Sequence, residues 1–279
     1  MRLPAGRMRR LPAVLTTLAL ALTAALTGSA PTAAASPTSA TTSHSGKPTI
    51  VLVHGAWADS SSWDAVVPRL RHDGYRTAAP ELGLVSLAAD VTQVRAVLDS
   101  IPGNKILVAH SYGGIVTSDA AAGRSDVLAL VFAAAFVPDQ GDSIASLGSG
   151  FTTSDAFNHL AFTGAPFASP AYIAPNLFRQ YFAQDLSPTQ AGLLDAAQRP
   201  LNFPIVTTAS GPVAWHNVPS WYAVSGSDRM IDPAEEVWMA TRAGAHTIEF
   251  PNTSHIGGIT RHADQFTALV ERAARATAR

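Results

Sequence analysis

The 279-residue chain is 47% hydrophobic and carries 19 basic against 20 acidic side chains, which gives a formal net charge of −1. This length and apolar content suit one large α/β domain with a sizeable core, and the balanced charge favours a small uncharged ligand over nucleic acid or an acidic surface. The chain has no cysteine. Disulfides, thiol nucleophiles and cysteine-ligated metals are therefore excluded.

The N-terminal residues are typical of an exported protein. Four arginines precede an apolar run from Leu11 to Leu26, and the small-residue sequence TGSAPTAAASPTSA follows it. This pattern predicts a signal peptide over residues 1–35, cleaved near Ala35, and a secreted product. The apolar run is short for a membrane span, so we expect no stable membrane anchor, with an uncleaved anchor as the alternative. Residues 36–47, rich in Ser and Thr, predict a flexible leader.

From residue 48 onward, apolar runs of strand length alternate with segments of helical period. Strands are expected at residues 49–56, 75–82, 105–111, 127–137, 220–228 and 245–252. Helices are expected at residues 63–74, 86–101, 112–123 and 233–244 and from about His262. This alternation predicts an α/β fold with a mostly parallel sheet that helices cover on both faces.

The alternation stops over residues 138–214, a stretch too long for an ordinary loop, which predicts a cap insertion with structure of its own. Seven of the chain's eleven phenylalanines lie in this stretch. They serve either to attach the cap to the core or to line an apolar substrate pocket, and the sequence leaves both interpretations open.

Ser111 lies where a buried strand meets a helix, in the sequence KILVAHSYGG of residues 105–114. The small residues Ala109 and Gly113 stand two positions before and after it, as a very sharp strand-to-helix turn requires. The usual motif has glycine at the first of these positions, where this chain has alanine. Such a turn exposes the hydroxyl at the carboxyl edge of the sheet, which predicts a nucleophilic serine.

A serine nucleophile needs a base, and His255 is the best placed of the nine histidines. It lies in the loop NTSHIGG after the last expected strand, at the same sheet edge as Ser111. His246 begins a strand and His262 begins a helix, and both remain alternatives. His110, the neighbour of the serine in a tight turn, is expected to point elsewhere.

Two aspartates in SGSDRMIDPAEE compete to orient the histidine. Asp232 precedes a proline and stands three residues before Glu235, which is the pattern of a helix N-cap with a capping box. We therefore expect Asp228, at the end of its strand, to accept the histidine's Nδ1 proton.

Attack on a carbonyl group produces an oxyanion, which backbone N–H groups stabilise when they are already in place. We expect one donor from Tyr112, the residue after the serine. The other is expected from Ala56 in the HGAW loop after the first strand, where Gly55 allows the backbone to come close.

Four expected strands carry, in chain order, the motifs HGAW, AHSYGG, SGSD and NTSH. In this order of strands and motifs the chain resembles the α/β-hydrolase superfamily over residues 48–279. The stretches VLVHGAWADSSSWDAVVPRL, ALVFAAAFVPDQGDSIASL and GAHTIEF resemble the branch that holds small bacterial esterases, plant methyl esterases and hydroxynitrile lyases. The resemblance implies an α/β-hydrolase fold with a helical cap, a triad of Ser111, Asp228 and His255, and no metal or organic cofactor.

These features together predict a secreted serine hydrolase that cleaves small, apolar or aromatic carboxylic esters through an acyl-enzyme. Hydroxynitrile lyases of the same branch have threonine where Gly55 stands and lysine directly after the histidine, where this chain has Ile256. Cyanohydrin cleavage is therefore disfavoured. Cofactor-independent cleavage of C–C bonds and a non-catalytic ligand-binding role remain alternatives, and the sequence gives no indication of the oligomeric state.

Overall fold

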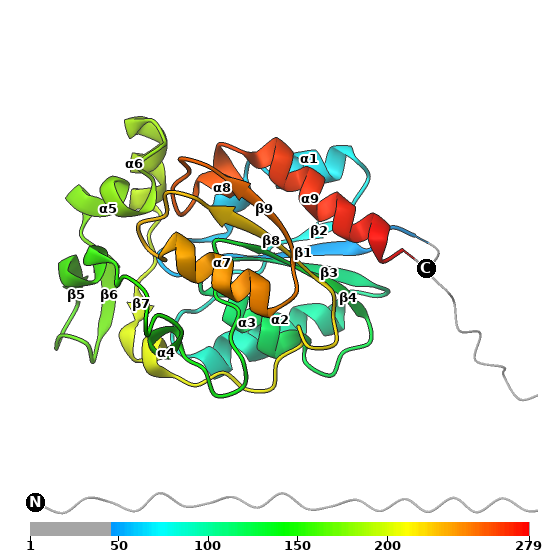
Figure 1. Ribbon diagram of the computed structural model, residues 1–279, viewed down its shortest axis with the longest axis horizontal. Helices are drawn as coiled ribbons and strands as arrows, with labels where there is room; N and C mark the ends of the chain where they lie inside the picture. Colours follow the sequence, from blue (N-terminus) through cyan, green and yellow to red (C-terminus); the bar gives the residue numbers. More distant parts are fainter. Residues whose placement is uncertain (1–45, 279) are drawn as a thin grey trace, which may run out of the picture. The chain divides into compact units, whose positions relative to one another are not determined.

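The structure is a computed structural model that describes residues 46–278. The predicted signal peptide, and all of the predicted leader except Gly46 and Lys47, lie outside the described residues. Six parallel strands form the central sheet, in the spatial order β2-β1-β3-β4-β8-β9 (Figure 1). The strands are β1 Thr49–Val53, β2 Thr77–Ala78, β3 Lys105–His110, β4 Val127–Ala133, β8 Ser220–Ser225 and β9 His246–Phe250.

Helices cover both faces of this sheet, which confirms the predicted doubly covered architecture. Helix α1 packs against α9 on one face, and α2 packs against α3 on the other (Figure 1). The helices outside the cap are α1 Val67–His72, α2 Leu87–Ser100, α3 Gly113–Ala121, α7 Pro233–Arg242, α8 Gly257–Thr260 and α9 Ala263–Ala276. Because both faces are covered, β1, β3 and β8 are buried at every residue and appear in the sequence as continuous apolar runs.

Most predicted elements are shorter than expected, and three of them differ most. The strand expected at residues 127–137 ends at Ala133, because Ala134 has a φ angle of 42° and cannot continue an extended strand. The helix expected at residues 63–74 is divided into a 3₁₀ turn, Ser60–Trp63, and α1, which begins anew with Pro68 in its first turn. Only two residues of the strand expected at 75–82 pair with the sheet.

The segment between β4 and β8 forms a cap of mixed structure. It contains the helices α4 Ile144–Leu147, α5 Pro175–Phe182 and α6 Pro188–Ala196, and the 3₁₀ helices η2 Asp155–His159 and η3 Phe203–Thr207. It also contains a small antiparallel sheet of β5 Leu160–Phe162, β6 Pro170–Ile173 and β7 Leu201–Asn202. The expectation of a helical cap did not include this sheet, whose strands are too short to show an alternating pattern. Among the described helices, none combines the length and the hydropathy needed to cross a bilayer.

Candidate active site

Ser111 occupies a strained turn between β3 and α3. Its φ angle is 54°, a left-handed conformation that residues other than glycine adopt only where the surroundings impose it. The Ser111 amide donates to the carbonyl of Ala133 at 3.3 Å, and its own carbonyl accepts from the Phe136 amide at 3.2 Å. These bonds to the chain beyond β4 hold the turn, and strain of this kind is typical of a nucleophile at a strand-to-helix turn.

The start of α3 lies directly against the loop that follows β1. A Cβ atom added at Gly113 would lie 2.6 Å from the carbonyl oxygen of Val53 and 2.7 Å from that of His54. A Cβ added at Gly55 would lie 2.6 Å from the Cβ atom of Ser111. Such distances leave no room for a side chain, so glycine at both positions is what allows the loop and the serine turn to touch.

The two backbone amides expected to bind an oxyanion belong to these touching segments. Ala56 and Tyr112 are 3% and 1% exposed. Neither of their amides donates a hydrogen bond to another residue within 46–278. A buried N–H group without a partner is costly, so both amides remain available to a ligand oxygen.

His54 fixes the loop that carries Ala56. Its ring is fully buried. Nε2 accepts a hydrogen bond from the Leu82 amide at 2.9 Å, while Nδ1 donates to the carbonyl of Gly55 at 2.8 Å. This pair of bonds holds the backbone of the loop in one position.

Asp228 and His255 form a buried pair. His255 Nδ1 lies 2.6 Å from Asp228 Oδ2, and the two side chains are essentially inaccessible to solvent. The other carboxylate oxygen, Oδ1, accepts from the amides of Met230 at 2.6 Å and Ile231 at 3.1 Å. These bonds fix the carboxylate, and the bond to Nδ1 leaves Nε2 of His255 free to accept a proton.

The alternative residues lie elsewhere. His246 is exposed at the start of β9 and packs on Trp221, while His262 packs on Phe250. Asp232 caps α7 by accepting from the Ala234 amide at 2.9 Å. The structure therefore brings together the histidine and the aspartate that the sequence favoured.

One part of the capping prediction is wrong. A capping box requires the side chain of Glu235 to reach back to the Asp232 amide, but Oε1 of Glu235 is buried without a hydrogen-bond partner among the described residues. The side chain instead lies in the wall of a cavity between cap and core. Asp232 also binds the amide of Thr152 at 2.9 Å, which ties the cap to α7.

His110 joins the serine turn to the histidine loop. Its Nε2 donates to the carbonyl of His255 at 3.0 Å, and the two ring centroids lie 4.6 Å apart. Burial, and then the charge of His255, hold the pKa of His110 well below its ordinary value, so this ring stays neutral. Within the described residues, Ser111 Oγ makes no hydrogen bond to His255, and His110 provides the contact between the two segments.

Two further residues lie beside the pair and were not singled out in the sequence. Phe182 from α5 of the cap meets the His255 ring edge-on at 4.9 Å. Glu236 is fully buried, and its side chain accepts from the Ser225 amide at 3.1 Å. Burial and the negative charge of Asp228 raise the pKa of Glu236 well above its ordinary value.

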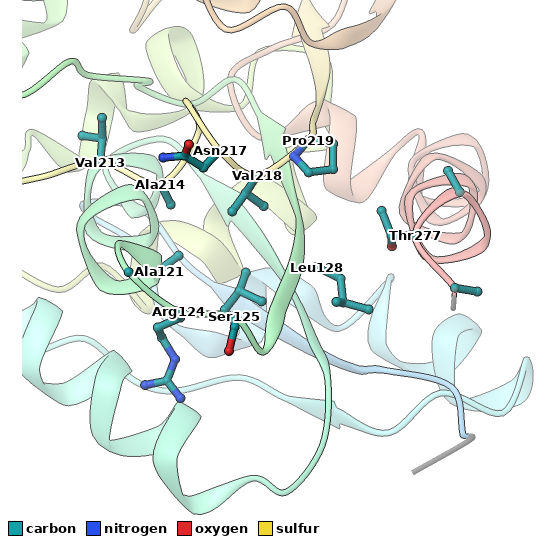
Figure 2. Close-up of a pocket in the computed structure, with 14 residues that line it drawn as sticks. Ala121, Arg124, Ser125, Leu128, Val213, Ala214, Asn217, Val218, Pro219 and Thr277 are labelled. Atoms are coloured by element: carbon teal, nitrogen blue, oxygen red, sulfur yellow. The ribbon is translucent and has the colours of Figure 1, made fainter. Parts of the chain in front are cut away.

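Two cavities differ in their relation to these residues. The larger, of about 630 Å³, lies at the amino ends of β4 and β8, between the end of α3 and the end of α9 (Figure 2). It is on the opposite edge of the sheet from Ser111. The other, of about 390 Å³, lies between cap and core and includes Phe136 and Met230, whose amides bind Ser111 and Asp228. Of the two, the smaller cavity is the one whose lining residues bond to residues of the site.

Known proteins resemble this chain in sequence and in fold. The model of the alpha/beta hydrolase family matches residues 50–269. A carbendazim hydrolyzing esterase from Nocardioides sp. (strain SG-4G) is 36% identical over 110 residues, which cover 35% of this chain and 46% of that esterase. The matched region thus spans less than half of that relative.

Solved structures match over nearly their whole length. Polyneuridine aldehyde esterase superposes with a TM-score of 0.69 at 19% identity, covering 81% of this chain and 99% of that one. A pyrethroid hydrolase from Sphingobium faniae JZ-2 superposes with a TM-score of 0.69 at 20% identity, covering 83% and 98%. The chain belongs to the alpha/beta hydrolase family, and these three relatives are esterases or hydrolases.

Burial gives Glu235 a measurable effect on stability. Desolvation, with the charges of Asp232 and Asp228, raises the pKa of Glu235 from 4.5 to about 7. A carboxyl whose folded pKa lies above its unfolded pKa favours the folded state fully below pH 4.5, and this contribution is lost as the pH rises through 7. Glu235→Gln should therefore gain stability relative to the wild type between pH 5 and pH 8, by at most about 3 kcal/mol.

Urea unfolding of both proteins at several pH values measures this difference. Glu249→Gln is the matched control, because Glu249 is exposed on β9. The difference in free energy of unfolding between this variant and the wild type should not change over the same pH range. If the difference in free energy of unfolding between Glu235→Gln and the wild type were also independent of pH, the carboxyl of Glu235 would ionise in the folded protein as it does in the unfolded chain.

Proposed function

We propose that the protein is a serine hydrolase that cleaves carboxylic esters of small apolar or aromatic compounds through an acyl-enzyme. The observation that carries this proposal is the buried Asp228–His255 pair at the sheet edge where Ser111 occupies its strained turn. The buried residues Ala56 and Tyr112, whose amides have no hydrogen-bond acceptor within residues 46–278, support it. The esterase relative supports the reaction class.

The reaction follows from the roles of these groups. Ser111 Oγ attacks the acyl carbon while His255 Nε2 takes its proton, and the carboxylate of Asp228 stabilises the imidazolium ion. The amides of Ala56 and Tyr112 donate to the oxyanion. As the tetrahedral intermediate collapses, the ester C–O bond breaks and the leaving alkoxide takes the proton from His255. Water then attacks the acyl-enzyme by the same steps and releases the acid.

The cavity beside the site supports small substrates with an apolar part. Phe136 of the core and the cap residues Phe157 and Phe203 line it. Other cap phenylalanines serve packing, since Phe178 and Phe182 are buried and stack at 4.9 Å. Under this proposal Phe157 and Phe203 line the substrate pocket, and Phe178 and Phe182 attach the cap to the core.

A panel of p-nitrophenyl esters of increasing acyl length tests the reaction class. We expect steady turnover without added metal, with kcat/KM rising with chain length up to a limit set by the cavity and then falling. The absorbance of the released p-nitrophenol measures the rate. A single stoichiometric burst, or no release above the uncatalysed rate, would favour a ligand-binding role and contradict the proposal.

We also propose that the protein is secreted. The arginine-rich start, the apolar run and the small residues that follow support export, although these residues lie outside the described part of the chain. The N-terminal sequence of protein recovered from the culture medium tests this. A start near residue 36 is expected, and retention of residues 1–35 would contradict it.

A further inference from the structure

The cavity between cap and core is lined by residues of two chemical kinds. Aromatic side chains of the lining include Phe136, Phe157 and Phe203. Polar residues of the lining come from the segment after α4 and from α7, among them Thr153 and Glu235. A wholly apolar ligand would leave the polar groups without partners, so the cavity suits a ligand with both an apolar and a polar part.

Residues that line this cavity contact three parts of the candidate active site or its loops. The Phe136 amide binds the carbonyl of Ser111, and the Met230 amide binds Asp228. The ring of Phe157 meets Trp57, the residue after Ala56, edge-on at 6.2 Å. These contacts favour a substrate whose acyl carbon lies at Ser111 and whose non-reacting part extends toward the cavity.

Glu235 is the buried polar side chain of this lining that has an oxygen without a hydrogen-bond partner among the described residues. The residue is 4% exposed, and Oε1 makes no hydrogen bond within the described part of the chain. A Cβ atom added at Gly148, which also lines the cavity, would lie 3.8 Å from Glu235 Oε2. The nearby hydroxyl of Ser154 is already bonded to the carbonyl of Arg229. A buried carboxyl without a partner destabilises the protein until a ligand supplies one.

We propose that Glu235 is a specificity residue that accepts a hydrogen bond from an O–H or N–H group on the apolar part of the substrate. This inference rests on the proposed esterase function. It assigns the substrate class as small aromatic esters that carry one such donor away from the reacting carbonyl. A site built to accept a hydrogen bond discriminates against an isosteric analogue without the donor, because its buried acceptor then stays unpaired.

The test compares matched esters. The p-nitrophenyl esters of phenylacetic acid with a hydroxyl group at the meta or para position are each paired with the ester that has a methyl group there. The ratio of kcat/KM, hydroxyl over methyl, is measured for the wild type and for Glu235→Leu. At one position or both, this ratio should fall by about tenfold in the variant, which is the effect expected for one hydrogen bond.

Control variants separate specificity from structure. Glu235→Gln keeps an accepting oxygen and should lower the hydroxyl-to-methyl ratio by only about threefold. If Glu235→Leu does not fold, the ratio in Glu235→Gln tests the inference. Glu249→Leu, on the exposed side of β9, should keep the wild-type ratio. An unchanged ratio in both Glu235 variants, or equal losses for the two members of every pair, would overturn the inference while the esterase function stands. Failure of the wild type to hydrolyse any of the esters would reject both.

Discussion

Replacement of Ser111 by alanine is expected to lower kcat by about six orders of magnitude, the loss typical of a serine and histidine that act as one unit. Alanine keeps the Cβ atom and accepts the same strained φ of 54°, so the fold should be unchanged. Steady-state hydrolysis of a p-nitrophenyl ester measures the loss, and thermal unfolding checks the fold. The residual rate reports what the amides of Ala56 and Tyr112 and substrate binding contribute without the nucleophile.

The matched control for this variant is Ser118→Ala. Ser118 is buried on α3, the helix that follows Ser111, and its hydroxyl makes no hydrogen bond among the described residues. Its removal should leave kcat within a fewfold range of the wild type. Turnover in Ser111→Ala comparable to that of Ser118→Ala would mean that the hydrolysis does not pass through Ser111.

Replacement of Asp228 by asparagine is the second large effect, with an expected loss of about 10⁴ in kcat. The carboxylate accepts from His255 Nδ1 and from the Met230 and Ile231 amides. An asparagine can keep its oxygen on the two amides only by turning its NH₂ group toward Nδ1, which then has to be the acceptor. The proton would move to Nε2, where it blocks the base.

Asp232→Asn provides the comparison within the same segment. Asparagine also caps helices well, so α7 should lose less than about 1 kcal/mol and turnover should change little. Measurement of kcat and of urea unfolding for both variants separates the two roles. If Asp232→Asn abolished turnover and Asp228→Asn did not, the orienting acid would be Asp232.

The sequence could predict those site residues that stand at the ends of strands. Apolar runs mark the strands, and the carboxyl ends of parallel strands meet at one edge, so the sequence alone could place Ser111, Asp228 and His255 together. Asp232 could be set aside because its pattern already indicated a helix cap. The structure then places Asp228 against His255 and Asp232 at the cap.

Other contacts of the site had no local signal. Phe182 reaches His255 from a cap helix, and its position depends on how the cap folds over the core. Glu236 is one of two adjacent glutamates on α7, and only the packing of that helix against β8 shows that it accepts from the Ser225 amide while Glu235 faces the cavity. His110 was expected to point away, and the direction it takes, toward the carbonyl of His255, follows from tertiary packing.

Covalent labelling tests the central claim most directly. A fluorophosphonate reacts with an activated serine when the hydroxyl oxygen attacks phosphorus and fluoride leaves, and peptide mass spectrometry then locates the adduct. The account predicts one equivalent of label on Ser111, on the peptide that contains AHSYGG, with labelling lost in Ser111→Ala and strongly slowed in Asp228→Asn. Label on a different residue, or none on a protein that hydrolyses esters, would contradict it.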